Sequence, residues 1–290
     1  MMFRFGPGRA ARRPGRLGPC GAALLAAAFL LSAGRAPAGP AGAGPECAAA
    51  APLPDGMLLP VVGQHVARGR PVRVLAIGSS STEGVGASSP ARAYPRQLEG
   101  TLARAWRDAP VSVVNAGIGG ETADQTLLRL EAALRQADKP DLVIWQVGTN
   151  DAVTGGDEAR FRGLLEHGVA LVRGAGIDLI LLDQQFYPAI PDRARYERYV
   201  GLVASVAAAA RVPVFSRYAL MREWGRQDPT VLSGMLAQDG FHMGDRGYDC
   251  LAQALGQGIV RAAAPAPGAA GAVARARPQA EPGAPSLRRG

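Results

Sequence analysis

Residues 72–84 read VRVLAIGSSSTEG, in which an apolar run passes directly into a turn of glycines and hydroxyl-bearing residues. The first six residues form a short β-branched run, typical of a strand that is covered on both faces. Helical spacing of apolar residues follows at about 94–107. A strand, a polar turn and a helix in this order form the repeating unit of parallel α/β sheets.

The same alternation continues along the chain. Further apolar runs lie at 111–114, 142–147, 179–182 and 212–215, and helical spacing lies at about 122–136, 159–173, 194–210 and 245–262. Right-handed crossovers between parallel strands place helices on both faces of a sheet. The pattern predicts a three-layer α/β/α protein whose parallel sheet has about five strands, as one domain over residues 64–263.

The two ends of the chain differ in composition from this domain. Residues 1–38 carry six arginines and no acid, an apolar run at 21–31 and small residues at 36–38. This layout predicts a secretory signal peptide and a secreted or periplasmic protein. The apolar run is shorter than the roughly 20 residues that span a bilayer, so no stable membrane span is expected after signal removal. A basic tail on a cytosolic protein is the alternative.

Two further segments are predicted to lack regular structure. Residues 39–63 are rich in Ala, Gly and Pro and read as an irregular lead-in, and residues 264–290 read as a disordered, basic Pro/Ala/Gly-rich tail. The formal net charge is +8, but the arginines that produce it lie at the two ends. A nucleic-acid-binding protein carries its positive charge as a patch on the folded domain, so this class of protein is not expected.

The chain has three cysteines, of which Cys20 lies in the expected signal peptide. Cys47 and Cys250 remain, and an even pair in an exported protein predicts a disulfide. Two unpaired thiols are the alternative. The cysteines are too few, and the three histidines too scattered, for a zinc site built from them.

Four polar blocks follow predicted strands. Ser80 comes after the first strand, Gly120 after the second and Asn150 after the third, while Asp239 and His242 come after the fifth, beyond a longer excursion. In open α/β sheets the ligand lies outside the carboxyl ends of the strands. The four blocks are therefore expected to meet at one edge of the sheet.

The residue types in these blocks are those that acyl transfer needs. Ser80, on a tight glycine-bearing turn, is the expected nucleophile, and its own N–H is one donor to an oxyanion. The Gly120 amide and the Asn150 side chain are the expected further donors. Each block has a plainer alternative, because Ser, Gly and Asn also form helix caps and turns.

Asp239-Gly240-Phe241-His242 is the sharpest of the four blocks. An Asp three residues before a His can accept the imidazole Nδ1–H, which frees Nε2 to take a proton from a serine. His65, before the first strand, and His167, on a predicted helix, lack such a carboxylate and read as surface or packing residues.

Together these residues resemble the SGNH (GDSL-type) hydrolase superfamily, named after its Ser, Gly, Asn and His. The resemblance covers about residues 72–250 and implies a flavodoxin-like fold, a catalytic role for Ser80, Asp239 and His242, and an oxyanion hole from Ser80, Gly120 and Asn150. It also implies that no metal or organic cofactor is needed. Two residues depart from the pattern: the usual Gly-Asp-Ser is Gly78-Ser79-Ser80 here, and Glu121 stands where an Asp is common.

The resulting expectation is an exported serine hydrolase of carboxylic esters, a short-chain esterase or carbohydrate deacetylase acting on a small-molecule or carbohydrate ester. An acyltransferase with a sugar hydroxyl as acceptor and a non-catalytic carbohydrate-binding protein on the same fold are the alternatives. Near the strand ends, four aromatic residues could line the substrate pocket or belong to the core: Trp145, Phe186, Tyr187 and Phe241. The sequence gives no prediction of the oligomeric state.

Overall fold

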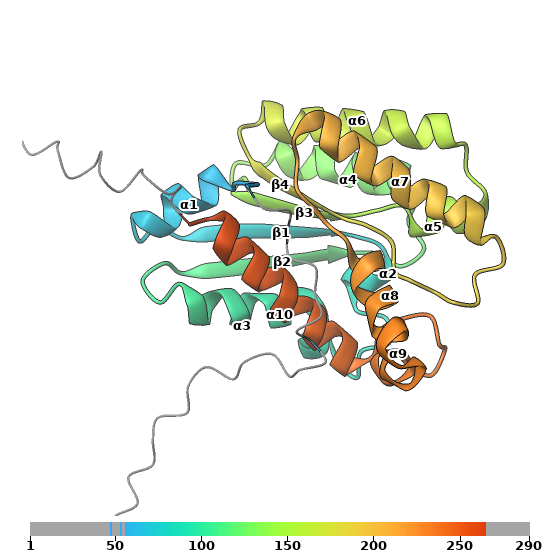
Figure 1. Cartoon of the computed structure of the whole chain (residues 1–290). Helices are drawn as coiled ribbons and strands as arrows, with labels where there is room; N and C mark the ends of the chain where they lie inside the picture. Colours follow the sequence, from blue (N-terminus) through green and yellow to red (C-terminus); the bar gives the residue numbers. More distant parts are fainter. Residues whose placement is uncertain (1–46, 48–52, 54–55, 265–290) are drawn as a thin grey trace, which may run out of the picture. The chain divides into compact units, whose positions relative to one another are not determined.

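The computed structural model describes Cys47, Leu53 and residues 56–264 (Figure 1). The expected signal peptide, the tail from residue 265 onward and most of the expected lead-in lie outside the described residues. The expected lead-in, residues 39–63, ends in a helix, α1 (Pro60–Ala67), which begins with a proline at its first position. Proline is favoured there because its fixed φ suits a helix and its missing N–H has no partner in the first turn.

The sheet has five parallel strands in the order β2-β1-β3-β4-β5. The strands are β1 (Val72–Gly78), β2 (Val111–Gly117), β3 (Leu142–Gln146), β4 (Asp178–Leu182) and β5 (Val214–Phe215). All residues of β3 and β4 are buried, as expected for strands that are covered on both faces. Strand order reverses at β1, which pairs with both β2 and β3, and this reversal is where open α/β sheets bind ligands.

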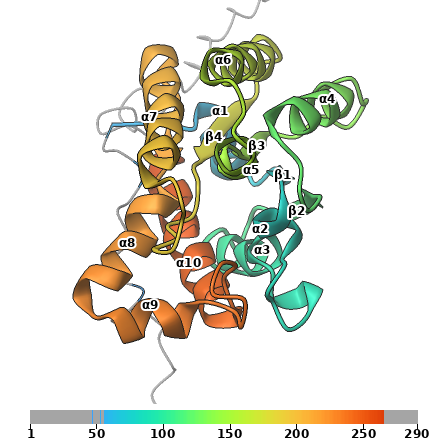
Figure 2. The same cartoon turned by 90° about the vertical axis from the view of Figure 1, so that its right-hand side faces the viewer.

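Two apolar cores separate the sheet from its two helix layers, which lie on opposite faces of the sheet (Figures 1 and 2). One layer contains α3 (Tyr94–Ala105) and α10 (Asp245–Ala262), and the other contains α4 (Ala123–Leu134), α6 (Glu158–Gly174) and α7 (Arg193–Ala210). Side chains of alternating strand positions enter the two cores: Val74 and Ile144 on one face, Leu75 and Trp145 on the other. The predicted three-layer α/β/α fold is confirmed.

Several short helices were not predicted as separate elements. Two of them start at the carboxyl ends of strands, α2 (Ser80–Glu83) after β1 and α5 (Thr149–Thr154) after β3. The excursion between β5 and α10 contains α8 (Arg217–Gln227) and α9 (Pro229–Met235), preceding the isolated bridge between Leu236 and Met243. One short 3₁₀ turn, η1 (Pro90–Arg92), precedes α3.

A disulfide joins Cys47 to Cys250 of α10, with the two Cα atoms 5.0 Å apart. Both cysteines are buried, and they are part of the core beneath α10. The bond thus fixes the chain near residue 47 to the last helix. Among the residues that the structure describes, no helix combines the length and the apolar character needed to cross a bilayer.

Candidate active site

A carboxylate, an imidazole and a hydroxyl form a continuous hydrogen-bonded chain at the carboxyl edge of the sheet. His242 Nε2 lies 2.9 Å from Ser80 Oγ, and His242 Nδ1 lies 2.6 Å from Asp239 Oδ2. Ser80 and His242 are 162 residues apart in the sequence. The fold therefore brings together the three side chains that the sequence analysis assigned to proton transfer and nucleophilic attack.

The turn that carries His242 is held by Asp239 itself. Asp239 Oδ1 accepts the backbone N–H groups of Phe241, at 3.0 Å, and His242, at 2.9 Å. Gly240 has a φ of +65°, a left-handed conformation that glycine adopts without strain. Partial burial raises the pKa of Asp239, but the hydrogen bonds from the His242 ring and the two N–H groups outweigh it, so the pKa lies below its usual range. The carboxylate is thus kept ionised beside the imidazole.

Ser80 is the first residue of α2, directly after a tight turn. Gln146 Oε1, at the end of β3, accepts three hydrogen bonds there: from Ser79 N–H at 2.9 Å, Ser79 Oγ at 3.2 Å and Thr82 Oγ1 at 3.1 Å. A Cβ at Gly78 would lie 2.6 Å from Thr82 Oγ1 and 2.7 Å from Gln146 Oε1, so only glycine fits. Neutral groups therefore hold the turn at the position where the superfamily pattern has an aspartate.

The expected oxyanion donors lie on neighbouring segments. Gly120 has a φ of +82°, and a Cβ there would meet nothing within 4 Å, so its surroundings are open. The Asn150 side-chain amide, on α5, donates to the Glu121 carbonyl at 2.7 Å, which places it beside the Gly120 loop. In the part of the chain that the structure describes, no residue accepts a hydrogen bond from the backbone N–H of Ser80 or Gly120.

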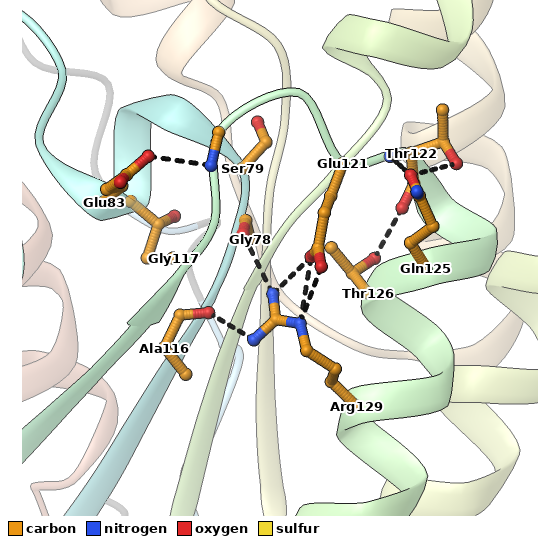
Figure 3. Close-up of polar contacts among 12 residues, drawn as sticks. Gly78, Ser79, Glu83, Ala116, Gly117, Glu121, Thr122, Gln125, Thr126 and Arg129 are labelled. Carbon is orange, nitrogen blue, oxygen red and sulfur yellow. Dashed lines mark hydrogen bonds and ion pairs between the residues drawn. The ribbon is translucent and has the colours of Figure 1, made fainter.

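Arg129, on α4, supports the loop that carries Gly120 (Figure 3). Its guanidinium forms an ion pair with Glu121 and also donates to two strand ends, to the Ala116 carbonyl at 2.7 Å and to the Gly78 carbonyl at 3.3 Å. Sequence reasoning noted Glu121 but missed Arg129. A charged residue between the apolar positions 127 and 130 of a predicted helix was the only signal that pointed to it.

Glu83, at the end of α2, holds the same loop from the other side. Its carboxylate accepts the Gly119 N–H at 2.7 Å, and Figure 3 shows Glu83 next to Gly117, at the end of β2. Gly117 lies against the same helix, because a Cβ there would be 2.0 Å from the Glu83 nitrogen. The turn that carries Ser80 and the loop that carries Gly120 are therefore fixed to each other by close backbone contact and by the hydrogen bond from Gly119 to the Glu83 carboxylate.

An apolar cavity of about 810 Å³ adjoins the His242 turn. Its lining includes Phe186, Tyr187, Leu232, Leu236 and Gly240. The Tyr187 ring packs edge-on against Phe241, with centroids 5.1 Å apart, and Phe241 packs edge-on against the His242 ring at 4.9 Å.

Of the four aromatic residues considered in the sequence analysis, Trp145 belongs to the core. Its side chain is fully buried, and its indole N–H donates to Thr126 Oγ1 at 3.1 Å. The remaining histidines also lie outside the hydrogen-bonded chain of the site. His65 Nδ1 lies 2.7 Å from the Pro71 carbonyl, and His167 Nε2 lies 3.2 Å from Glu131. Within the described ranges, no group of three His, Cys, Asp or Glu side chains is arranged to hold a metal ion.

The known proteins to which this chain is similar include several esterases. Esterase TesA of Pseudomonas aeruginosa is 32% identical over 132 residues, which cover 45% of this chain and 60% of that esterase. A crystal structure of TesA superposes with a TM-score of 0.55 at 25% identity, over 64% of this chain and 97% of the other. A two-domain esterase active on acetylated mannans gives a TM-score of 0.60 at 21% identity, over 73% of this chain and 56% of that one.

This chain thus spans about three fifths of the length of the curated relative that it matches. A family model described as the Non-GDSL lipase-like family matches residues 46–265, which include every residue of the candidate site. The resemblance to SGNH (GDSL-type) hydrolases is confirmed at the level of family and fold. The chain belongs to the Non-GDSL lipase-like family.

Proposed function

We propose that the protein is a serine hydrolase of carboxylic esters. The observation that carries this proposal is the unbroken hydrogen-bonded chain from Asp239 through His242 to Ser80, with distances of 2.6 and 2.9 Å. A hydroxyl is a weak nucleophile until a base removes its proton, and this arrangement supplies both the base and the carboxylate that orients it.

In the proposed mechanism, His242 Nε2 takes the Ser80 proton as Ser80 Oγ attacks the ester carbonyl carbon. The oxyanion of the tetrahedral intermediate accepts hydrogen bonds from the Ser80 and Gly120 N–H groups and from the Asn150 side chain. The imidazolium then protonates the leaving alkoxide, and an acyl-enzyme remains. Water, deprotonated by His242, attacks the acyl carbon and releases the acid and free Ser80.

Replacement of Ser80 tests the proposal. Ser80→Ala is expected to lower kcat for p-nitrophenyl acetate by about 10⁴-fold or more and to abolish labelling by a fluorophosphonate probe. Ser205→Ala is the matched control, because Ser205 lies on the exposed side of α7 and its hydroxyl donates only to the Leu202 carbonyl. Wild-type turnover by folded Ser80→Ala would refute the proposal.

Small acyl groups on carbohydrates are the proposed substrate class. The support is that a fold neighbour is active on acetylated mannans, and that the Tyr187 and Phe241 rings lie beside His242, where they offer apolar faces to a substrate. Release of acetate from acetylated oligosaccharides should exceed release of fatty acids from phospholipids, with Ser80→Ala as the blank. The opposite order would place the enzyme among lipases.

Export to an oxidising compartment is also proposed. Its support is the Cys47–Cys250 disulfide together with the signal-like composition of residues 1–38. Fractionation of the producing cells should find the protein outside the cytoplasm with no free thiol at Cys47 or Cys250. A cytoplasmic, fully reduced protein would contradict this part of the proposal.

A further inference from the structure

Gln185 connects the two halves of the candidate site. It lies three residues after the end of β4. Its side chain contacts both the turn that carries Ser80 and the turn that carries His242. Its Oε1 accepts the Ser81 hydroxyl at 2.9 Å, and its Nε2 donates to the Phe241 carbonyl at 3.1 Å. Ser81 follows Ser80, and Phe241 precedes His242, so one amide bridges the neighbours of both reacting residues.

The glutamine side chain of this bridge is buried. Gln185 is 1% exposed and Ser81 2% exposed, so water cannot easily replace the bond between them, and the bond to the Phe241 carbonyl is partly buried. A separate hydrogen bond involves only the backbone of Gln185: its carbonyl accepts the Tyr196 hydroxyl at 2.8 Å, and this bond does not involve the side-chain amide. The polarity of the amide also matters, because its oxygen faces a hydroxyl donor and its NH₂ faces a carbonyl acceptor.

We propose that Gln185 is a positioning residue that sets the distance between Ser80 Oγ and His242 Nε2. This inference rests on the proposed ester hydrolysis. The two turns come from distant parts of the chain, and no other described side chain donates to the Phe241 carbonyl. A misplacement of about 1 Å between reacting groups can lower a rate by about 100-fold, so a bridge of this kind controls kcat rather than substrate binding.

Gln185→Ala should therefore lower kcat for p-nitrophenyl acetate by about 10- to 100-fold and leave KM within about threefold. Tyr196→Phe is the matched control: it removes a buried hydrogen bond to the same residue's backbone but leaves the amide bridge intact. Tyr196→Phe should lower Tm about as much as Gln185→Ala does, but it should keep kcat within about threefold of wild type.

The variant Gln185→Glu adds a second test, the pH dependence of kcat, which would not change if Gln185 served only the stability of the fold. The carboxylate still accepts the Ser81 hydroxyl, but its second oxygen then faces the Phe241 carbonyl and repels it. A protonated carboxyl group can donate there as the amide does. The ratio of variant to wild-type kcat should therefore rise as the pH falls, while the Gln185→Ala ratio stays constant with pH.

The outcomes separate this inference from the proposed function. Wild-type kcat in Gln185→Ala, or equal losses in Gln185→Ala and Tyr196→Phe, would overturn the positioning role even if Ser80→Ala is inactive. Full activity of Ser80→Ala would instead overturn the hydrolase proposal. If Gln185→Ala fails to fold, the pH dependence of the isosteric Gln185→Glu variant decides the question: a ratio that does not change with pH overturns the role.

Discussion

Ser79, the residue before the candidate nucleophile Ser80, shows how the residue type at one position depends on the side chain that it contacts. Ser79 is 3% exposed, and both its N–H and its hydroxyl donate to Gln146 Oε1. An aspartate at this position, as in the superfamily pattern, would place a carboxylate against an amide oxygen. The serine and the glutamine therefore form a matched neutral pair.

Ser79→Asp is expected to destabilise the protein although it restores the superfamily residue. The buried carboxylate would meet Gln146 Oε1, and rotation of the amide would leave the Ser79 N–H and the Thr82 hydroxyl facing an NH₂ group. An unsatisfied buried polar group costs about 1–3 kcal/mol. Urea unfolding should show this loss, and Ser79→Asp with unchanged or greater stability would contradict the matched pair.

The sequence predicted the three candidate catalytic residues, which the structure brings together, but not the residues that support them. Ser80, Asp239 and His242 are recognisable because the proposed chemistry requires those residue types at these spacings. Gln185 and Arg129 could not be assigned in this way, since their roles depend on which backbone carbonyl lies opposite them in three dimensions. A glutamine after a strand and an arginine on a helix are common, and only the fold places them against Phe241, Gly78 and Ala116.

At the scale of elements, α4 links a helix layer to the edge of the sheet. Gln125 stabilises its N-terminus, because the Gln125 Oε1 atom accepts the Thr122 N–H at 2.9 Å and the Thr122 hydroxyl at 3.2 Å. Arg129 lies about two turns further on, where it reaches the ends of β1 and β2. The Gly120 loop is therefore held by residues from two parts of α4, the first turn and the middle of the helix.

Arg129→Met should displace this loop. The substitution keeps an unbranched apolar stem but leaves Glu121 and the Gly78 and Ala116 carbonyls without the guanidinium. We expect a fall in kcat of about 10- to 100-fold, the range for partial loss of one oxyanion donor, and a lower Tm. Arg135→Met, at the C-cap of the same helix, is the control, since the Arg135 side chain is 70% exposed and its ion pair with Glu131 is 3.9 Å long. Equal effects of the two substitutions would contradict a role of Arg129 in the loop.

The sequence predicted those strands and helices whose buried positions are occupied by apolar residues in a regular pattern. Strands covered on both faces read as apolar runs, and the predicted helix 245–262 matches α10 at both ends. By contrast, α8 contains three arginines, and one of them, Arg217, is fully buried beside Tyr218, Leu220, Met221 and Trp224. A charged residue on the buried face interrupts the apolar pattern from which a helix is predicted, so the sequence did not indicate α8 as a separate element.

At the scale of the whole molecule, a carboxylate ties α1 to the sheet at the edge opposite the candidate site. Asp178, the first residue of β4, accepts the Val62 N–H in the first turn of α1 at 2.9 Å. Burial raises the pKa of Asp178 to about 6, against the smaller opposing effect of that hydrogen bond. The native state therefore binds a proton at Asp178 more tightly than the unfolded chain does.

This proton makes stability depend on pH. Its stabilising contribution is complete below the ordinary carboxyl pKa and is lost as the pH rises through about 6. Asp178→Asn keeps an acceptor for Val62 but cannot titrate. The free energy of unfolding of wild type minus that of the variant should therefore decrease by about 1–2 kcal/mol between pH 4 and pH 8, after allowance for partial solvation. Urea titrations at several pH values measure it, and a difference that grows with pH would contradict the assignment.

The long sequence separation between Ser80 and His242 has a consequence for how the protein comes into being. A ribosome makes the hydroxyl early and its base late, with most of the sheet in between. The proposed ester hydrolysis therefore requires that the segment after β5, which carries Asp239 and His242, has been made and has packed against the turn after β1.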